Sequence, residues 1–377
     1  MKITFISTLL SKWGGSEVLW VQCVENAISQ GHQVQVVVFA QTGGYHSGIE
    51  KVRNIAQSFV ALPNPLNNSG YLSKALASIK NKILPFKPDE IINFNPDTIL
   101  VNQPDTYSSA FNPTINSILN AVNKPFFLFS HFNADHEILS YPDMEKARNI
   151  FAKAKAIYFV SQRNLDVAQR QLAMTIKNAS VIGNHPDISK FNLLNYSPVD
   201  GIINFGSVAR LEAQFKGQDI LLQVLSAPVW EDRQWMLNFY GTGPDEKYLK
   251  ELAAYYGLTS KVKFHGHVSN IKEIWANNHL LLMASTGEGK PLALEEAMAC
   301  GRVAVVSDVA GNKELVDDGI NGFLASSYFP KPFAEALEIA WQKKNDWPAM
   351  GVKAQQKIAD TIDVNPQQTL INNIVQV

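Results

Sequence analysis

The fold of this chain is constrained most by a series of short apolar runs that alternate with helical patterns along the sequence. A short apolar run between turn residues is typical of a buried strand, and the helical stretches between such runs are typical of crossover connections. The sequence therefore predicts an α/β protein with doubly wound, parallel sheets. The runs that we assign to strands are residues 3–8, 33–40, 98–102, 125–130, 156–160, 202–205, 235–240, 262–265, 279–284 and 303–307.

The length of the chain predicts two such sheets rather than one. Its 377 residues exceed what one ordinary hydrophobic core holds, so two domains of roughly 150–200 residues are expected. Residues 192–200 have no periodicity and read as a linker between a first domain at 1–191 and a second at 201–350. Residues 351–377 contain two further helical patterns without a strand between them.

Composition argues against several classes of protein. No apolar run reaches the ~18 residues that a membrane span needs, and the chain enters its first strand at once, so no signal peptide is expected. Cys23 and Cys300 are isolated, which fits a reducing cytoplasm rather than a disulfide framework or a zinc site. Residues 1–190 carry 17 Lys and Arg against 13 Asp and Glu. A weakly basic first half of the chain can face a membrane or an anionic acceptor, but its charge is too small to indicate nucleic-acid binding.

Residues 71–86 form an amphipathic helical pattern with a basic polar side that includes Lys74, Lys80 and Lys82. A basic amphipathic helix can lie on a membrane surface. We favour the simpler interpretation, an ordinary surface helix packed on a core. The protein is thus expected to be cytoplasmic, and peripheral contact with the inner face of the membrane is kept as the second interpretation.

One stretch, residues 285–301, combines a glycine-bearing loop with the start of a helix directly after the apolar run 279–284. Because Pro291 marks the first helical turn, Glu288 lies in the loop while Glu296 lies on the helix. A helix start presents free backbone N–H groups and positive dipole charge to an anion. Carboxylates accept hydrogen bonds from vicinal hydroxyls. Two carboxylates beside an anion site suit a nucleotide sugar, which has a diol on each side of its diphosphate.

The same stretch resembles the signature of the retaining glycosyltransferases of family 4, which have the GT-B fold. The signature is Glu, seven residues, Glu and then Ala-Met-Ala, and Glu288, Glu296 and residues 297–299 match it in register. The resemblance implies that Glu288 holds hydroxyls of the donor sugar and that Glu296 holds the ribose. The usual Phe-Gly after the first glutamate is Lys290-Pro291 here, which removes one backbone donor. We interpret this as a variation within the family; without the resemblance, the stretch would be a capped helix with solvated acidic residues.

A second part of the resemblance supplies two cations. The family pattern Gly-x-x-x-Arg-Leu, with Lys-Gly six residues beyond the arginine, is matched by Gly206, Arg210 and Lys216. Fixed cations can stabilise a departing diphosphate in place of a metal ion, and the resemblance implies this role for Arg210 and Lys216. Without this context, both would be interpreted as surface residues.

Glycine turns after predicted strands complete the expected donor site. Gly14 and Gly15 follow the first strand, where a backbone without side chains can approach a phosphate or sugar closely. In the family, the turn that matches residues 266–268 holds the base through backbone groups, which implies Val268 as the contact. The residues predicted to bind the nucleotide sugar are Gly14, Gly15, Gly206, Arg210, Lys216, Gly241, Thr242, His267, Val268, Glu288, Gly289, Lys290, Pro291, Leu292 and Glu296.

His131 directly follows the apolar run 125–130, so it is expected at the carboxyl edge of the first sheet, where sites form. The family places a histidine near the donor sugar and acceptor after the matching strand, which implies a role in the reaction. The neighbouring Asp135, His136 and Glu137 match no standard metal-binding spacing, and no metal site is predicted. The residues predicted to be catalytic are His131, Arg210, Lys216 and Glu288.

The resemblance implies two Rossmann-like domains that face a central cleft, with the acceptor on the first domain and the donor on the second. It also implies that the helices of 351–377 cross back to the first domain. The implied reaction moves a sugar, with retention, from a nucleotide diphosphate donor to a hydroxyl of a cell-envelope or exopolysaccharide-type acceptor. We favour UDP-glucose or a related UDP-sugar as donor and a growing or lipid-linked saccharide as acceptor. No metal and no other cofactor is expected.

Two other functions stay open at this point, and a third is disfavoured. A UDP-GlcNAc 2-epimerase shares the fold but needs no acceptor, and the paired-glutamate signature argues against it. A non-catalytic protein that binds nucleotide sugars would turn nothing over, which the intact Glu288, Arg210 and Lys216 disfavour. A Rossmann dehydrogenase is disfavoured because the full dinucleotide fingerprint is missing.

Overall fold

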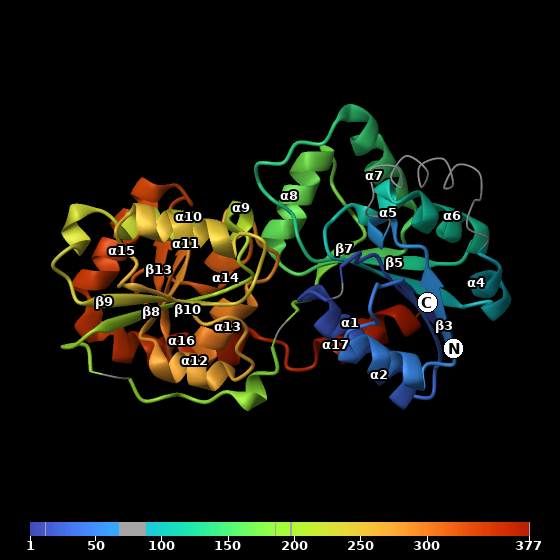
Figure 1. Ribbon diagram of the computed structural model, residues 1–377. Helices are drawn as coiled ribbons and strands as arrows, with labels where there is room; N and C mark the ends of the chain where they lie inside the picture. The colour runs from blue at the N-terminus through green and yellow to red at the C-terminus, as the bar shows by residue number, and fades with distance from the viewer. Residues whose placement is uncertain (12, 68–87, 185, 197, 377) are drawn as a thin grey trace. The chain divides into compact units, whose positions relative to one another are not determined.

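The computed structural model describes residues 1–11, 13–67, 88–184, 186–196 and 198–376, which belong to two compact units (Figure 1). The first unit consists of residues 1–184 together with 365–377, and the second of residues 185–364. The amphipathic segment 71–86, for which we considered a membrane contact, lies outside the described residues.

The first unit is built on a seven-stranded, all-parallel sheet with the order β3-β2-β1-β4-β5-β6-β7. The first three strands are added in one direction from β1, and β4 is then added on the other side of β1. The order of the strands therefore reverses between β1 and β4, and the carboxyl ends of these two strands form the switch point at which such sheets bind ligands. The strands are β1 (Lys2–Ser7), β2 (Gln33–Phe39), β3 (Ser58–Leu62), β4 (Thr98–Gln103), β5 (Phe126–Ser130), β6 (Ala156–Phe159) and β7 (Ala179–Val181).

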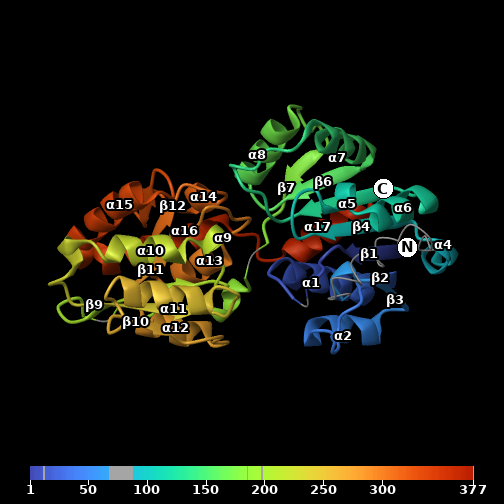
Figure 2. The same ribbon diagram turned by 45° about the horizontal axis from the view of Figure 1, so that its top comes forward.

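Helices cover both faces of this sheet, because successive side chains of a strand point to opposite faces and both sets are apolar. Ile3 and Phe5 pack towards one helical layer and Ile6 towards the other. The first layer contains α1 (Ser16–Ser29), α2 (Ser47–Ile55) and α17 (Pro366–Val375) (Figure 2). The second contains α4 (Asp89–Phe94), α5 (Ser108–Phe111), α6 (Pro113–Val122), α7 (Tyr141–Lys153) and α8 (Gln162–Leu172).

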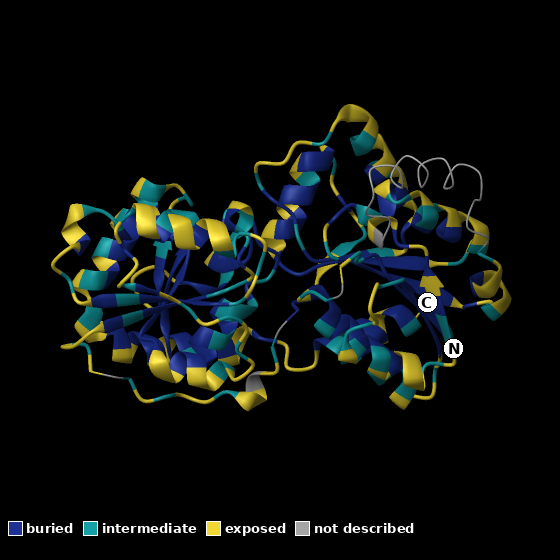
Figure 3. Cartoon of the chain, viewed as in Figure 1, coloured by how far each residue is buried: buried dark blue, intermediate teal, exposed yellow. Residues whose placement is uncertain are grey.

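The second unit has a six-stranded, all-parallel sheet with the order β10-β9-β8-β11-β12-β13, and its strands are largely buried except for β10 at the edge (Figure 3). The strands are β8 (Ile203–Val208), β9 (Trp235–Tyr240), β10 (Val262–Phe264), β11 (Leu280–Met283), β12 (Val303–Ser307) and β13 (Phe323–Ala325). The helices are α9 (Ala213–Lys216), α10 (Gln218–Leu225), α11 (Glu246–Tyr255), α12 (Ile271–Asn277), α13 (Leu292–Ala299), α14 (Asn312–Leu315), α15 (Pro330–Gln342) and α16 (Trp347–Thr361).

The predicted fold class is confirmed, and every apolar run that we assigned to a strand is one. Three strands were not predicted: β3, β7 and β13. All three lie at the edge of a sheet, and β7 and β13 have only three residues each. An edge strand of this length buries too few side chains to leave a clear apolar run in the sequence.

The boundaries of the units differ from the predicted ones because residues 193–196 are tied to the second unit. The Leu194 N–H donates to the carbonyl of Cys300, and the Arg302 guanidinium donates to the carbonyls of Leu194 and Asn195. The segment 192–200 is therefore part of the second unit, and the first unit ends at Asn184.

The two terminal helices belong to different units. Helix α16 stays in the second unit, where Ala354 and Ile358 pack in one core with Met298 of α13. Only α17 belongs to the first unit: Leu370 and Ile374 are buried there, and α17 lies beside α1 in Figure 1. The expectation that all of 351–377 returns to the first domain therefore holds for 365–377 alone.

Candidate active site

Two loops of the second unit meet because the strands that precede them, β8 and β11, are neighbours in the sheet. Thr286 connects the two loops by hydrogen bonds. Its N–H donates to the Phe215 carbonyl at 2.9 Å, and its hydroxyl donates to the Gln214 carbonyl at 2.6 Å. Gly217, at φ +62°, makes this approach possible, since a Cβ at this position would lie 2.0 Å from the Ala284 carbonyl oxygen. The loops that carry Lys216 and Glu288 are thereby held together.

Lys216 and Glu288 form an ion pair at this junction. The Lys216 Nζ lies 2.7 Å from both carboxylate oxygens of Glu288, and the Ser285 hydroxyl donates to Oε1 at 2.8 Å. Only 9% of the Glu288 side chain and 23% of the Lys216 side chain are exposed. Lys216 was predicted to bind the diphosphate of the donor and Glu288 its sugar hydroxyls. In the structure these two side chains face one another, and the charge of each is offset by the other.

A second buried ion pair, which we did not predict, joins the loop before α13 to the helix itself. Lys290, predicted as a donor contact, lies 3.5 Å from the carboxylate of Glu295, and both side chains are almost fully buried. Burial, with the charge of Glu295 next to it, raises the pKa of Glu296 to about 7. Glu296 is half-buried at the position predicted for the ribose contact. A carboxyl group with a pKa near 7 therefore lies at this edge of the site.

Arg210 is the most exposed of the predicted cations, with 59% of its side chain in solvent and its Nε 3.6 Å from Glu212. Its position depends on backbone contacts between the loops after β8 and β9. The Leu211 N–H donates to the Thr242 carbonyl at 3.1 Å, and a Cβ on Gly241 would lie 2.0 Å from the Ala209 carbonyl oxygen. Gly241 is therefore needed for the close approach of two loops, a role that we did not predict for it.

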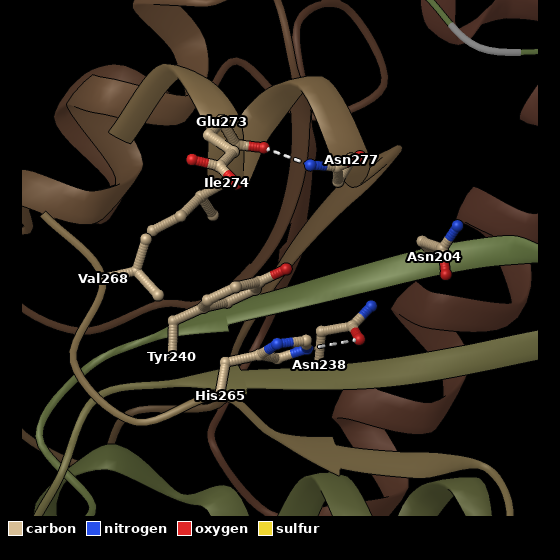
Figure 4. Close-up of a pocket in the computed structure, with 8 residues that line it drawn as sticks. All are labelled: Asn204, Asn238, Tyr240, His265, Val268, Glu273, Ile274 and Asn277. Atoms are coloured by element: carbon tan, nitrogen blue, oxygen red, sulfur yellow. Dashed lines mark hydrogen bonds between the residues drawn. The ribbon is translucent and has the colours of Figure 1, made fainter. Parts of the chain in front are cut away.

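Most of the remaining residues predicted for the donor site lie on strands of the second sheet or in the loops and helices next to them. Gly206 lies under α12, where a Cβ would come within 3.2 Å of Trp275 and Asn278. His267 is exposed, and Val268 lines a cavity beside α12 (Figure 4). Gly289 and Pro291 are buried in the loop before α13, and Leu292 begins that helix. Contacts of these residues with a nucleotide sugar stay predictions.

The first unit holds a buried chain of hydrogen bonds at the carboxyl ends of β1, β4 and β5. The Glu17 carboxylate accepts from Ser7 Oγ at 3.1 Å, Ser16 Oγ at 3.3 Å and Asn102 Nδ2 at 2.9 Å. The other end of the Asn102 amide, Oδ1, lies 2.7 Å from His131 Nε2. His131 thus sits at the predicted edge, connected through Asn102 to the helix that starts after Gly14 and Gly15.

This chain of hydrogen bonds determines how His131 can act. Burial lowers the pKa of His131 to about 3, so its ring is neutral. Because the Asn102 amide nitrogen donates to Glu17, its oxygen faces the ring, and His131 Nε2 must carry the proton. Its Nδ1 then keeps a lone pair and can accept a hydrogen bond. Glu17 and Asn102 are not among the residues that we predicted for the site. Glu17 ends the Gly-Gly-x-Glu segment that follows the first strand, and Asn102 lies at the end of an apolar run.

No group of three or more His, Cys, Asp or Glu side chains arranged for a metal ion occurs within the described part of the chain. Asp135, next to the histidines that we considered, instead lies 2.8 Å from Arg163 in an ion pair. The described residues also include no helix of the length and apolarity that a membrane span requires.

The second unit matches a known protein family over most of its length. Residues 203–343 match the glycosyl transferases group 1 family. The chain is 28% identical over 176 residues to the GtfA subunit of a UDP-N-acetylglucosamine–peptide N-acetylglucosaminyltransferase from Streptococcus pneumoniae. This match covers 46% of the chain but only 35% of that protein, well under two thirds of its length.

Several solved structures resemble the whole chain. The Anabaena protein HepE, solved in complex with UDP, has a TM-score of 0.75 and 20% identity over 100% of both chains. The lipopolysaccharide outer core galactosyltransferase WaaB, solved in its apo form, has a TM-score of 0.70 and 20% identity over 100% of this chain and 99% of its own. This likeness assigns the GT-B fold of two parallel-sheet α/β units.

Proposed function

We propose that this protein transfers a sugar from a UDP-linked donor to a hydroxyl of a saccharide acceptor, with retention at the anomeric carbon and without a metal ion. The observation that carries the proposal is the Lys216–Glu288 pair, which combines a phosphate-binding cation with a hydroxyl-binding carboxylate at the carboxyl edge of the group 1 domain. HepE was solved with UDP, the GtfA subunit belongs to an enzyme that uses a UDP-sugar, and WaaB acts on lipopolysaccharide. These proteins support the donor and acceptor classes.

In this proposal, binding of the donor opens the Lys216–Glu288 ion pair. Lys216 and Arg210 then form ion pairs with the diphosphate, while Glu288 accepts hydrogen bonds from the donor sugar. The bond between the anomeric carbon and the diphosphate oxygen then breaks, and its electron pair stays on the phosphate, where the two cations stabilise the charge. The acceptor oxygen forms its bond to the same face of the carbon, and its proton passes to the departing phosphate oxygen.

In this proposal, Glu296 and His131 each bind a further part of the substrates. Glu296, with its pKa near 7, accepts hydrogen bonds from the ribose when it is ionised. The neutral His131 uses Nδ1 to accept a hydrogen bond from a sugar hydroxyl, so it orients a substrate rather than donating a proton. We propose that Glu17 and Asn102 are positioning residues for this ring.

The first test is a calorimetric titration of the protein with UDP, GDP and ADP. We expect UDP to bind most tightly and Glu296→Ala to weaken UDP binding at least tenfold, whereas Glu335→Ala, at an exposed site on α15, should not weaken it. Transfer is then measured as release of UDP from UDP-glucose, UDP-galactose and UDP-N-acetylglucosamine, with and without saccharide acceptors. Acceptor-independent formation of a 2-epimer would contradict transfer, and tight UDP binding without any product would indicate a non-catalytic binding protein.

The metal-free scheme is tested on the same assay. Because Lys216 and Arg210 are proposed to stabilise the leaving diphosphate, the rate in excess EDTA should stay within about twofold of the rate without it. Loss of activity in EDTA with recovery in Mg²⁺ or Mn²⁺ would show that a metal, and not these cations, carries the charge.

A further inference from the structure

A cavity of about 330 Å³ lies beside α12, on the face of the second sheet that this helix covers (Figure 4). Its floor is buried and is formed by Asn238 and Tyr240 of β9 with Ile274 of α12. Its rim is exposed and includes His265 and Glu273. A cavity with a buried floor and an open rim has the form of a small-molecule site rather than that of a packing defect.

The cavity is distinct from the proposed donor loops. Asn204, the second residue of β8, lines it, so the cavity extends along the strands towards their amino ends. Lys216 and Glu288 lie in loops that follow the carboxyl ends of β8 and β11. Val268 is the only residue of the predicted donor site among those that line the cavity, and its predicted contact with the base uses backbone groups.

A network of hydrogen bonds fixes the floor of the cavity. The His265 Nε2 lies 2.9 Å from Asn238 Oδ1, and the Asn238 amide nitrogen donates to Asn278 Oδ1 at 3.0 Å. The Asn278 amide nitrogen in turn donates to the Tyr240 hydroxyl at 2.9 Å and to the Ile274 carbonyl at 2.7 Å. The Tyr240 and His265 rings stack with their centres 4.5 Å apart. A ligand would therefore meet side chains that are already ordered, which lowers the entropy cost of binding.

The polar groups that stay available suit hydroxyls. Tyr240 accepts from Asn278 and makes no hydrogen bond as a donor to a described residue, so its O–H can donate to a ligand. The Asn204 side chain makes no hydrogen bond with described residues and offers both a donor and an acceptor. The Glu273 carboxylate at the rim adds an acceptor. Burial and Lys263 lower the pKa of His265, so its ring is neutral at pH 7. Among the described residues that line the cavity, Glu273 is then the only one with a charged side chain.

From this arrangement we propose that the cavity binds one neutral sugar unit of a saccharide. A lone carboxylate with no cation disfavours phosphates and nucleotides, while amide, carboxylate and phenol groups beside aromatic rings match the alternating donors, acceptors and C–H faces of a pyranose. The volume lies at the lower end of ligand sites, which span roughly 300–1,000 Å³, so a single unit fits. This binding site goes beyond the proposed transfer reaction, since its polar side chains are not among the residues assigned to the donor, and Val268 is the one described residue that the two sets share.

The test is titration of the full chain, followed by saturation-transfer NMR, with methyl glucoside, methyl galactoside, N-acetylglucosamine, uridine and UDP. The variants Glu273→Gln and Asn277→Ala change exposed rim residues, so the fold should not depend on them. Glu251→Gln, an exposed carboxylate of α11 that does not line the cavity, is the matched control. The donor-site variant Glu296→Ala separates this cavity from the proposed UDP site.

We expect at least one of the neutral sugars to bind saturably, with its affinity lowered at least fivefold in Glu273→Gln and in the double variant that combines Glu273→Gln with Asn277→Ala. Glu251→Gln and Glu296→Ala should bind the sugar as the unchanged protein does, and UDP affinity should stay the same in Glu273→Gln. The proposal is overturned if no neutral sugar binds, if Glu296→Ala but not Glu273→Gln abolishes sugar binding, or if uridine displaces the sugar, which would make the cavity a nucleoside site. Failure of UDP to bind at all would overturn the proposed function and leave this result intact.

Discussion

At the scale of single residues, the candidate site depends on charges that are offset before any ligand arrives. Lys216 and Glu288 hold one another at 2.7 Å, and Lys290 and Glu295 form a second, more deeply buried pair. A buried pair loses much of its attraction to desolvation, while removal of one partner leaves a charge in a costly environment. Substitutions at these positions will therefore affect stability as well as binding, and experiments must measure both.

Lys216→Ala should lower kcat/KM for transfer by roughly 30- to 1,000-fold, because a charge-assisted contact to the leaving group is worth about 2–4 kcal/mol in the transition state. The comparison is steady-state kinetics of UDP release against Lys247→Ala, a lysine of α11 with 89% of its side chain exposed. Urea unfolding of both variants separates a folding defect from a catalytic one. A rate within threefold of the unchanged protein would rule out the leaving-group role of Lys216.

Glu17 should make the stability of the protein depend on pH. Burial raises its pKa from 4.5 to about 7, so the folded state binds more protons than the unfolded state between these values. Its contribution to stability is full below pH 4.5 and is lost as the pH rises through about 7. Glu17→Gln should remove this loss and be more stable than the unchanged protein at pH 8 by up to ~3 kcal/mol. Urea unfolding at pH 5 and pH 8 measures the difference; an equal gain at both pH values would contradict this assignment.

At the scale of elements, glycines decide how closely the loops of the second unit approach one another. Gly217 and Gly241 lie where a Cβ would be 2.0 Å from a carbonyl oxygen of a neighbouring loop. Both have positive φ angles, +62° and +136°. Since Lys216 directly precedes Gly217, the backbone at this glycine also sets where the lysine can reach.

Gly217→Ala should destabilise the second unit more than Gly257→Ala does. Both glycines have a positive φ, +62° and +71°, which costs an alanine roughly 1–2 kcal/mol. Gly257 has nothing within 4 Å of an added Cβ, whereas Gly217 meets the Ala284 carbonyl, which adds a further ~1–3 kcal/mol. The urea midpoints of the two variants test this. Equal midpoints would show that the loop relaxes without cost and that close approach is not the reason for Gly217.

At the scale of the whole molecule, the chain leaves the first unit at Asn184 and returns to it with residues 365–377. The returning helix α17 contributes Leu370, Ile371 and Ile374 to the core that α1 also lines. The first unit therefore completes its core only when the last residues of the chain are in place. Folding of this unit depends on contacts between distant parts of the sequence, which close slowly.

The double variant Leu370→Ala with Ile374→Ala should destabilise the first unit by at least ~4 kcal/mol, because each change removes a fully buried side chain. Hydrogen exchange read by mass spectrometry can report the two units separately, and protection should fall in β1, β2 and β4 but not in β8 or β9. Asn372→Ala, an exposed position of the same helix, is the control. Equal loss of protection in both units would show that they unfold as one.

The sequence alone determined the α/β class, the two parallel sheets and the loops in which candidate site residues lie. These features follow from apolar periodicity and from glycine and proline positions, which act over a few residues and are visible in one segment at a time. The roles expected for Glu288 and Glu296 came instead from the resemblance of residues 288–299 to a family signature. The edge strands β3, β7 and β13 were not predicted, since they bury too few residues to produce a pattern.

Only the tertiary structure decided which of these residues meet and in what protonation state. The Lys216–Glu288 pair exists because β8 and β11 are neighbours and Gly217 admits a carbonyl at 2.0 Å, neither of which a linear pattern encodes. The same holds for the chain from Glu17 through Asn102 to His131, for the return of α17 without α16, and for the cavity beside α12. Desolvation and hydrogen bonding between distant segments set these properties, and both depend on the packed arrangement of the elements.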